Sequence, residues 1–405
     1  MERKTDIKIF AEQIEETATA QIERIAAMDA FKGAKIRIMP DVHAGAGCVC
    51  GFTANLGEKV VPNLIGVDIG CGMLTAVLGA IDIDCARLDA VIRQFIPFGL
   101  SVHEKSVDVS AYRAYDCNPR DCKVEFAPGR YDRFDRSIGS LGGGNHFIEI
   151  DVGQDGCKYL VVHCGSRNFG KCVCDAWQDR AVREMEGRVI PLSDMIAEAK
   201  ASCKDVREIQ GAIKRARERY QAMRAKEFVD KDLAWLAGDL REAYVHDMKI
   251  AQRWAVLNRE TIVQVICREM GWTPKATFST VHNYLGEDNV IRKSAISAKK
   301  GERVLIPLNM RDGSILAVGK GNEDWNNSAP HGAGRLMSRT AARSQVSVDE
   351  FKRTMEGVWT TCVGADTVDE SPFAYKGSES IIRQIGETVD VLEVVKPLYN
   401  FKASE

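Results

Sequence analysis

Residues 66–73 of the 405-residue chain read GVDIGCGM, an apolar stretch that Asp68 interrupts and in which two glycines flank Cys71. On both sides, from residue 35 to residue 78, short apolar runs alternate with glycine, proline and aspartate. Such runs predict strands joined by tight turns. Considered alone, the thiol of Cys71 is compatible with four roles: a buried apolar side chain, half of a disulfide, a nucleophile or a metal ligand.

Farther out, the sequence predicts helices around these strands. Helical spacing of apolar residues occurs in four segments, at residues 6–31, 83–97, 176–265 and 346–356. Two apolar runs between residues 140 and 168 predict a β-hairpin, and further strands are expected after residue 272. The prediction is therefore an α+β fold with central mixed β-sheets that carry the functional site, surrounded by helices, with a helical insertion near 176–265. We expect one domain over residues 1–405, because the chemistry-bearing segments span the chain and no low-complexity linker divides it.

The composition is typical of a globular protein in a reducing compartment. The formal net charge of −2 excludes a uniformly basic surface but not a local basic groove. The thirteen cysteines are irregularly spaced, the N-terminal residues are charged, and no run of about 18 apolar residues occurs. We therefore expect free thiols, no signal peptide, no membrane span and a cytoplasmic location. The densely charged residues 204–228 are compatible with a solvated helix or with a surface that binds polyanions.

The seven histidines divide into two groups by their surroundings. His103 and His246 lie in polar or helical contexts that are typical of surface or structural residues. The other five lie beside glycine, asparagine or aspartate at the ends of apolar runs, at positions 43, 146, 163, 282 and 331. A strand end holds a side chain rigidly and leaves it accessible, which suits ligands and catalytic groups. With Asp68 and Cys71, these histidines form a donor set that zinc, manganese, cobalt or nickel accepts, and a thiolate can bridge two cations.

Two glycine-rich stretches predict phosphate binding. LGGGN at residues 141–145 and HGAGR at residues 331–335 offer backbone N–H groups without bulky side chains, and HGAGR leads into a predicted helix. Neither matches the GxxxxGK[ST] phosphate loop or a GxGxxG dinucleotide motif. Beside such a turn, His331 is a candidate nucleophile toward phosphorus, because neutral imidazole attacks readily near neutral pH.

Six separated motifs together identify a family. PDVH, VDIGCGM, GNHFIE, HCGSR, HNY and HGAGR occur in this order, and from about Arg37 onward the chain closely resembles the RtcB family of RNA ligases. The resemblance implies an enzyme that joins an RNA 2′,3′-cyclic phosphate or 3′-phosphate end to a 5′-hydroxyl end, in RNA repair or tRNA splicing. It also implies GTP and two Mn²⁺ ions as cofactors. Broken tRNA, rRNA or mRNA would be the substrate, and an accessory activating protein would be a further partner.

The resemblance assigns roles to individual residues. The two Mn²⁺ ions would be held by Asp68, Cys71, His146, His163 and His282, with Cys71 bridging them. His331 would attack the α-phosphate of GTP and form a histidine–GMP intermediate. Contacts to the nucleotide would come from Asn145, Glu149, Lys293, Ser314, Gly332, Ala333, Gly334, Tyr375 and Lys402. His43 and Arg167 would lie near the RNA end or support the metal ligands.

Some segments depart from the family pattern, and other functions stay open. LNMRDGS follows Ile306 and Pro307 where the family has GSMG, and Pro330 precedes His331 where serine is common. A metal-dependent phosphoesterase acting on cyclic phosphate ends would need the metal ligands but not His331 as a nucleophile. An RNA-binding homologue with altered nucleotide use would need neither the ligase activity nor the phosphoesterase activity.

Overall fold

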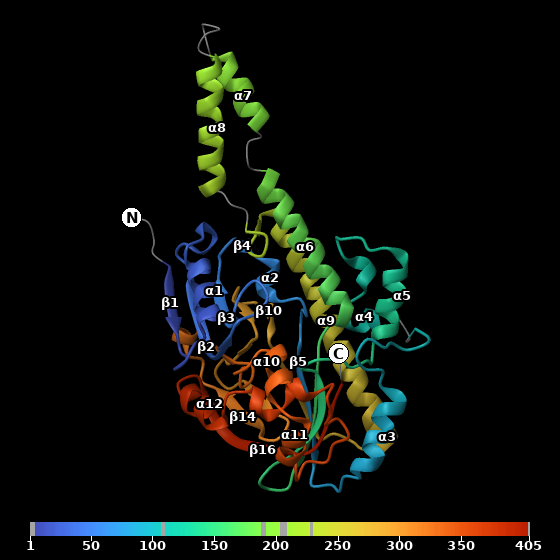
Figure 1. Ribbon diagram of the computed structural model, residues 1–405. Coiled ribbons are helices and arrows are strands. Elements are labelled where there is room, and N and C mark those ends of the chain that lie inside the picture. Colours follow the sequence, from blue (N-terminus) through green and yellow to red (C-terminus); the bar gives the residue numbers. More distant parts are fainter. Residues whose placement is uncertain (1–4, 107–109, 188–191, 203–208, 227–229, 404–405) are drawn as a thin grey trace.

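The computed structural model describes residues 5–106, 110–187, 192–202, 209–226 and 230–403 (Figure 1). Within them, a seven-stranded sheet has the order β13–β14–β16–β6–β7–β5–β9, and all neighbouring strands are antiparallel. Its strands are β5 (Gly72–Gly79), β6 (Phe147–Val152), β7 (Lys158–Cys164), β9 (Ala276–Val281), β13 (Arg303–Asn309), β14 (Gly313–Gly319) and β16 (Val389–Lys402). The backbone N–H of Leu305 on β13 donates to Thr280 Oγ1 on β9 at 3.2 Å. The sheet therefore curls until its two edge strands meet.

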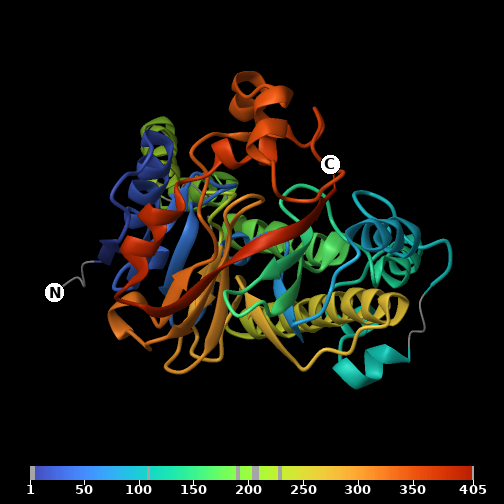
Figure 2. The same cartoon turned by 90° about the horizontal axis from the view of Figure 1, so that it is seen from below.

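A second sheet has five strands in the order β1–β2–β3–β11–β10. It is mixed, because β1 pairs parallel with β2 while the other neighbours are antiparallel. Its strands are β1 (Asp6–Ile9), β2 (Lys35–His43), β3 (Cys50–Asn55), β10 (Asn283–Leu285) and β11 (Ile291–Lys293). Two short pairs join β12 (Ala295–Ser297) to β15 (Ser328–Pro330), and β4 (Lys59–Val60) to β8 (Leu236–Ala237). Figure 2 shows the long strand β16, in red, crossing the molecule beside the green strands.

Helices surround these sheets. In the described ranges they are α1 (Glu16–Ala26), α2 (Pro62–Ile65), α3 (Cys85–Phe95), α4 (Ala111–Tyr115), α5 (Pro128–Ser137), α6 (Arg167–Gly187), α7 (Leu192–Ala201), α8 (Ile209–Lys226), α9 (Asp239–Met270), α10 (Arg339–Gln345), α11 (Val348–Thr354) and α12 (Ser378–Ile385). Short 3₁₀ turns lie at η1 (Asp29–Phe31), η2 (Pro119–Asp121), η4 (Glu323–Trp325), η5 (Val368–Glu370) and η6 (Pro372–Ala374). The α+β prediction, with mixed sheets enclosed by helices, is confirmed. The assignment of residues 1–405 to one domain stays a prediction.

Helix α9 connects the two largest hydrophobic clusters. Its first half, including Trp254, belongs to a cluster that also contains residues of β2, β3 and α6. Its second half, including Ile262 and Ile266, belongs to a cluster with residues of α3, β5, β6 and β7. Trp254, Ile262 and Ile266 are fully buried. Burying side chains of this size removes large apolar areas from water. The helix is thus the main support beneath the strands whose ends carry the candidate ligands.

Two local predictions were wrong. Residues 6–31 were expected to be helical throughout, but Asp6–Ile9 form strand β1 because they pair in register with Lys35–Ile38 of β2. The apolar run NLIGVDIG at residues 63–70 was expected to be a strand, but Pro62–Ile65 form helix α2 and a turn follows. Proline is well tolerated at a helix start, where its missing N–H would have no partner. The predicted hairpin is confirmed, because β6 and β7 pair with Phe147 opposite His163.

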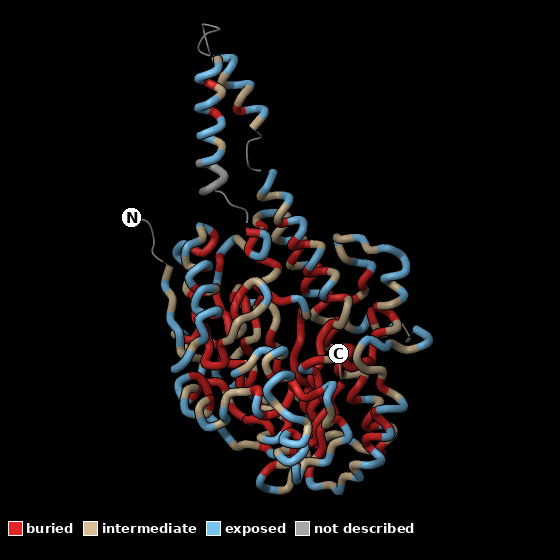
Figure 3. Tube along the Cα trace, viewed as in Figure 1, coloured by how far each residue is buried: buried red, intermediate tan, exposed pale blue. Residues whose placement is uncertain are grey.

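The predicted helical insertion is confirmed where the structure describes it, as α6, α7, α8 and α9, interrupted by the short strand β8. Helices α7 and α8 project from the rest of the molecule (Figure 1), and most of their described residues are exposed (Figure 3). The charged stretch 204–228 lies partly outside the described residues. Its described part is in α8, where Lys214, Arg215, Arg217 and Arg219 are exposed.

Candidate metal centre and adjoining cavity

Four strand ends bring the candidate ligands together. Cys71 precedes β5, His146 precedes β6, His163 is near the end of β7, and His282 follows β9. The register explains the meeting, because Gly72 lies opposite both Cys164 and Val281, and Phe147 lies opposite His163. Neighbouring strand ends therefore converge on one point of the curled sheet.

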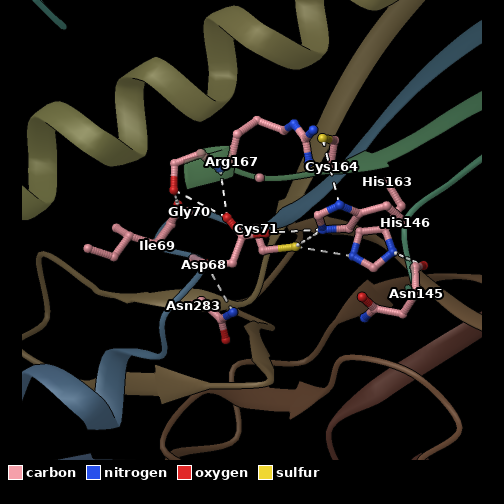
Figure 4. Close-up of polar contacts among 12 residues, drawn as sticks. Asp68, Ile69, Gly70, Cys71, Asn145, His146, His163, Cys164, Arg167 and Asn283 are labelled. Atoms are coloured by element: carbon pink, nitrogen blue, oxygen red, sulfur yellow. Dashed lines mark hydrogen bonds and ion pairs between the residues drawn. The ribbon is translucent and has the colours of Figure 1, made fainter. Parts of the chain in front are cut away.

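The side chains converge closely. Cys71 Sγ lies 3.3 Å from His146 Nε2 and 3.4 Å from His163 Nε2, as Figure 4 shows. His163 Nε2 lies 3.4 Å from His282 Nε2, and Asp68 Oδ2 lies 3.1 Å from His146 Nε2. All four of the cysteine and histidine side chains are buried. Cys71, His146 and His163 form a candidate metal site, and the other two predicted ligands adjoin it.

The electrostatics of these groups favour a bound cation. Burial, together with the charges of the neighbouring histidines, holds the pKa values of His163 and His282 well below the usual range. Both rings are therefore neutral, with lone pairs available for a metal. Burial and the Asp68 carboxylate raise the pKa of Cys71 to about 12, a shift that a coordinated cation would reverse. The thiol, imidazole and carboxylate donors suit a first-row divalent metal.

The glycines around Cys71 admit neighbouring backbone. Gly70 has φ +71°, and a Cβ there would lie 2.8 Å from the Cα of Gln252 on α9. A Cβ on Gly72 would lie 2.4 Å from the carbonyl oxygen of Thr280 on β9. The guanidinium of Arg259 on α9 donates at 2.7 Å to the carbonyl oxygens of Gly70 and Cys164. The glycines thus let a helix and a strand close onto the turn that carries the thiol.

His331 lies next to the metal site and is held by Asp41. The ring centroids of His331 and His282 are 4.9 Å apart. Asp41 Oδ2 lies 2.6 Å from His331 Nδ1 and accepts the backbone N–H of His331 at 3.1 Å. An Nδ1–H that donates to a buried carboxylate leaves the Nε2 lone pair free. Sequence reasoning missed Asp41, although it belongs to the PDVH motif from which His43 was selected.

A cavity of about 580 Å³ opens beside His331 and His163. His331 lines it, together with seven of the nine residues predicted to contact the nucleotide: Asn145, Glu149, Gly332, Ala333, Gly334, Tyr375 and Lys402. Leu308, Asn309 and Met310, from the segment that departs from the family pattern, also line it. Ser314 and Lys293 are buried and are not among the described residues that line the cavity, although their chain neighbours Gly313 and Ser294 are. Lys293 Nζ donates to the carbonyl of Ala46 at 2.7 Å.

Comparison with known proteins agrees with this geometry. The family model described as tRNA-splicing ligase RtcB matches residues 21–403. The chain belongs to the RtcB family. RNA-splicing ligase RtcB of Escherichia coli K12 is 28% identical over 419 residues, covering 95% of this chain and 93% of the relative. The tRNA-splicing ligase RtcB of Archaeoglobus fulgidus is 26% identical over 447 residues, covering 91% and 87%.

In this RtcB protein, charged pairs surround Lys402 on the wall of the cavity. Lys402 Nζ lies 2.7 Å from Glu370 Oε2, and the hydroxyl of Tyr375 donates to the same carboxylate at 2.6 Å. Burial opposes ionisation of Glu370, but the charges of Lys402, Arg339 and Arg335 outweigh it and lower its pKa. Between the paired strands β16 and β6, the side-chain amide of Asn400 donates to the carboxylate of Glu149 at 2.5 Å. Sequence reasoning missed Glu370, which no quoted motif contains.

Two motifs of this RtcB protein also make packing contacts. None of the three glycines of LGGGN is among the described residues that line the cavity, and a Cβ on Gly142 would lie 1.9 Å from His146 Nδ1. Arg167 is also absent from that lining, and its guanidinium donates to Ser140 Oγ at 3.2 Å and to the carbonyl of Gly99 at 2.5 Å. The helix expected after HGAGR, α10, begins only at Arg339, so the glycine turn offers its N–H groups without a helix N-terminus.

Two general expectations can also be compared with the described residues. Their cysteines are all free thiols, as predicted. Among the helices that the structure describes, none has both the length and the apolar character required to cross a membrane.

Proposed function

We propose that this protein is an RNA ligase that joins a 2′,3′-cyclic phosphate or 3′-phosphate end of RNA to a 5′-hydroxyl end, in RNA repair or tRNA splicing. The relatives that cover most of the chain are named RNA-splicing or tRNA-splicing ligases. The observation that carries the proposal is the position of His331, held by Asp41 and adjoining both the candidate metal site and the cavity. Use of GTP and Mn²⁺, an accessory activating protein and a cytoplasmic location belong to the same proposal.

The donor set fits divalent cations. The donor set combines the neutral imidazoles of His163 and His282, whose Nε2 atoms lie 3.4 Å apart, with the thiol of Cys71 and the carboxylate of Asp68. We propose that Asp68, Cys71, His146, His163 and His282 hold two Mn²⁺ ions, with Cys71 between them. Divalent cations at this position would neutralise a triphosphate and stabilise the departing pyrophosphate.

The residues of the chain itself would perform the covalent step. Asp41 accepts the Nδ1 proton of His331, so that Nε2 attacks the α-phosphorus of GTP while the bond to the β-phosphate oxygen breaks. The Asp41 carboxylate would stabilise the positive charge that develops on the ring. GMP would then pass from His331 to the RNA 3′-phosphate, and the 5′-hydroxyl would displace it. This is the guanylyl-histidine intermediate that the resemblance predicts.

The part of the cavity wall around Lys402 suits a purine base. Glu149, Tyr375 and Lys402 line it and offer a carboxylate, an aromatic ring and an ammonium group. Guanine presents both hydrogen-bond donors and an acceptor, so a carboxylate and an ammonium group can read its two sides. We propose that Asn145 and the Gly332–Gly334 turn contact the phosphates, with Ser314 and Lys293 supporting the wall behind them.

Incubation with α-³²P-GTP and Mn²⁺ tests the proposal. We expect label on the wild-type protein and none on His331→Ala, followed by ligation of RNA with a 2′,3′-cyclic phosphate and a 5′-hydroxyl end. His246→Gln is the matched control, because the His246 side chain is 42% exposed and should label like wild type. Wild-type protein that hydrolyses cyclic phosphate ends without becoming labelled would instead indicate a phosphoesterase and contradict the ligase.

A further inference from the structure

A cysteine and a histidine face each other on the wall of the same cavity. Cys50 begins β3 and pairs in register with His43, which ends β2. Both residues line the cavity that contains His331. His43 Nδ1 lies 2.9 Å from the carbonyl oxygen of Asp41. Paired residues of neighbouring antiparallel strands project to the same face, so the imidazole of His43 lies beside the thiol of Cys50, as a base lies beside a candidate nucleophile.

The charges around Cys50 favour the thiolate. Burial opposes ionisation, but the charge and hydrogen bond of His43, together with Lys293 and a hydrogen bond from Ser294, lower the pKa of Cys50 to about 6. Burial opposes the charged form of His43 as well, yet Cys50 and Asp41 raise its pKa to about 9. Two residues away, burial instead raises the pKa of Cys48 to about 12. Near neutral pH the pair is therefore a thiolate and an imidazolium, whereas the neighbouring thiol stays protonated.

We propose that Cys50 is a peroxide-reactive thiol whose oxidation to a sulfenic acid stops the transfer of GMP to His331. The Cys50 thiolate attacks one oxygen of a hydroperoxide, an S–O bond forms and the O–O bond breaks. His43 gives its proton to the departing oxygen, which leaves as water or an alcohol. The sulfur loses two electrons and the peroxide gains them, so that the products are Cys50 sulfenic acid and neutral His43.

Asp41 connects this chemistry to the nucleophile. Its backbone carbonyl contacts His43 Nδ1, while its carboxylate holds His331 through Nδ1 and the backbone N–H. Oxidation removes the positive charge of His43 and adds an oxygen atom to the wall of the cavity. Both changes occur beside the residue that orients His331. The effect on GMP transfer rests on the proposed function, whereas the reactivity of Cys50 does not.

The first measurement follows the thiol without any catalytic assay. Metal-free protein is treated with hydrogen peroxide and dimedone at about pH 7, and the labelled peptides are identified by mass spectrometry. We expect label at Cys50 to form at least about tenfold faster than at Cys172, which is also partly exposed but whose pKa is raised by burial. His43→Gln should remove most of that difference. Equal rates at Cys50 and Cys172 would overturn the proposal.

The second measurement follows the effect of Cys50 oxidation on the transfer of GMP to His331. After catalase removes the peroxide, Mn²⁺ and α-³²P-GTP are added, and labelling of treated protein is divided by that of untreated protein for each variant. We expect a large loss for wild type that dithiothreitol restores, and no loss for Cys50→Val. A loss of the same size in Cys50→Val would overturn the proposal and locate the sensitive thiol elsewhere. If untreated protein never labels, the ligase proposal fails, and the dimedone result alone decides the reactivity of Cys50.

Discussion

Two regions of the site, the metal end around Cys71 and the base end around Lys402, are built in different ways. At the metal end, Cys71, His146 and His163 come from the ends of adjacent strands and contact one another. At the base end, Lys402 and Glu370 come from the last strand and from η5, and a buried ion pair joins them. Sheet register therefore positions the first group, whereas the meeting of segments from different parts of the chain positions the second.

The two ends also differ in what they lack. At the metal end, the imidazoles of His163 and His282 are neutral and the pKa of the Cys71 thiol is about 12, so these three donors carry no charge. The base end is already compensated, because Glu370 contacts Lys402, Arg335 and Arg339. A change at one end should therefore leave the other intact, and the following predictions test that independence.

The largest effect is expected for Cys71→Ala. Losing the central donor should reduce metal affinity by more than about 100-fold, because even changes in residues behind the ligands cost up to that much. GMP labelling should become undetectable, while binding of a fluorescent GTP analogue without metal should persist. Metal analysis by mass spectrometry and nucleotide titration check the two ends separately.

Cys172→Ala is the control, since Cys172 lies on α6 outside the cavity lining. Two ions bound to Cys71→Ala with wild-type affinity would refute the bridging role. Loss of nucleotide binding together with the metal would show that the two ends are not independent.

A smaller effect, of about 100-fold on the rate of GMP labelling, is expected for Asp41→Asn. The amide would still contact His331 but would not stabilise the charge that develops on the ring. Metal content should be unchanged, because Asp41 contacts no predicted ligand among the contacts described. Single-turnover labelling measures the rate, and exposed Asp132→Asn is the control. Labelling of Asp41→Asn at the wild-type rate would exclude this role.

The comparison also explains how far the sequence could predict the site. The donors of the metal end could be predicted from the sequence because they lie in short motifs at strand ends, and antiparallel register brings such ends together. Asp68, Cys71, His146, His163 and His282, all selected from the sequence, lie within one cluster. The α+β class could also be predicted, because short apolar runs and helical periodicity over long segments are both local signals in the sequence.

The remaining features depend on contacts that no local pattern encodes. Glu370 has no motif of its own, and it acquires a role only because η5 meets the end of β16. Strand β1 is polar enough to resemble the start of a helix, yet pairing with β2 determines its structure. Asp41 lay within a selected motif, but sequence alone could not show which of its two polar residues faces His331.

The base end can be disrupted separately through Glu370→Gln. Lys402 would remain buried without a counter-ion, and breaking a buried pair in this way costs about 3 kcal/mol of unfolding free energy. GTP binding should weaken, because Lys402 and Tyr375 lose the charge of their common acceptor, while metal content should stay at the wild-type level. Urea unfolding and nucleotide titration measure the two effects, with exposed Glu356→Gln as the control.

The pH dependence of the same variant separates charge from packing. The pKa of Glu370 is lowered in the folded protein from its ordinary value of 4.5, so its carboxylate stabilises the fold above pH 4.5 and loses that contribution as the pH falls through the folded value. The difference in unfolding free energy between wild type and Glu370→Gln should therefore be largest near neutral pH and shrink in acid. A difference that stays constant across this range would mean that Glu370 acts through packing, and the base end would then resemble the metal end in being held by shape rather than by charge.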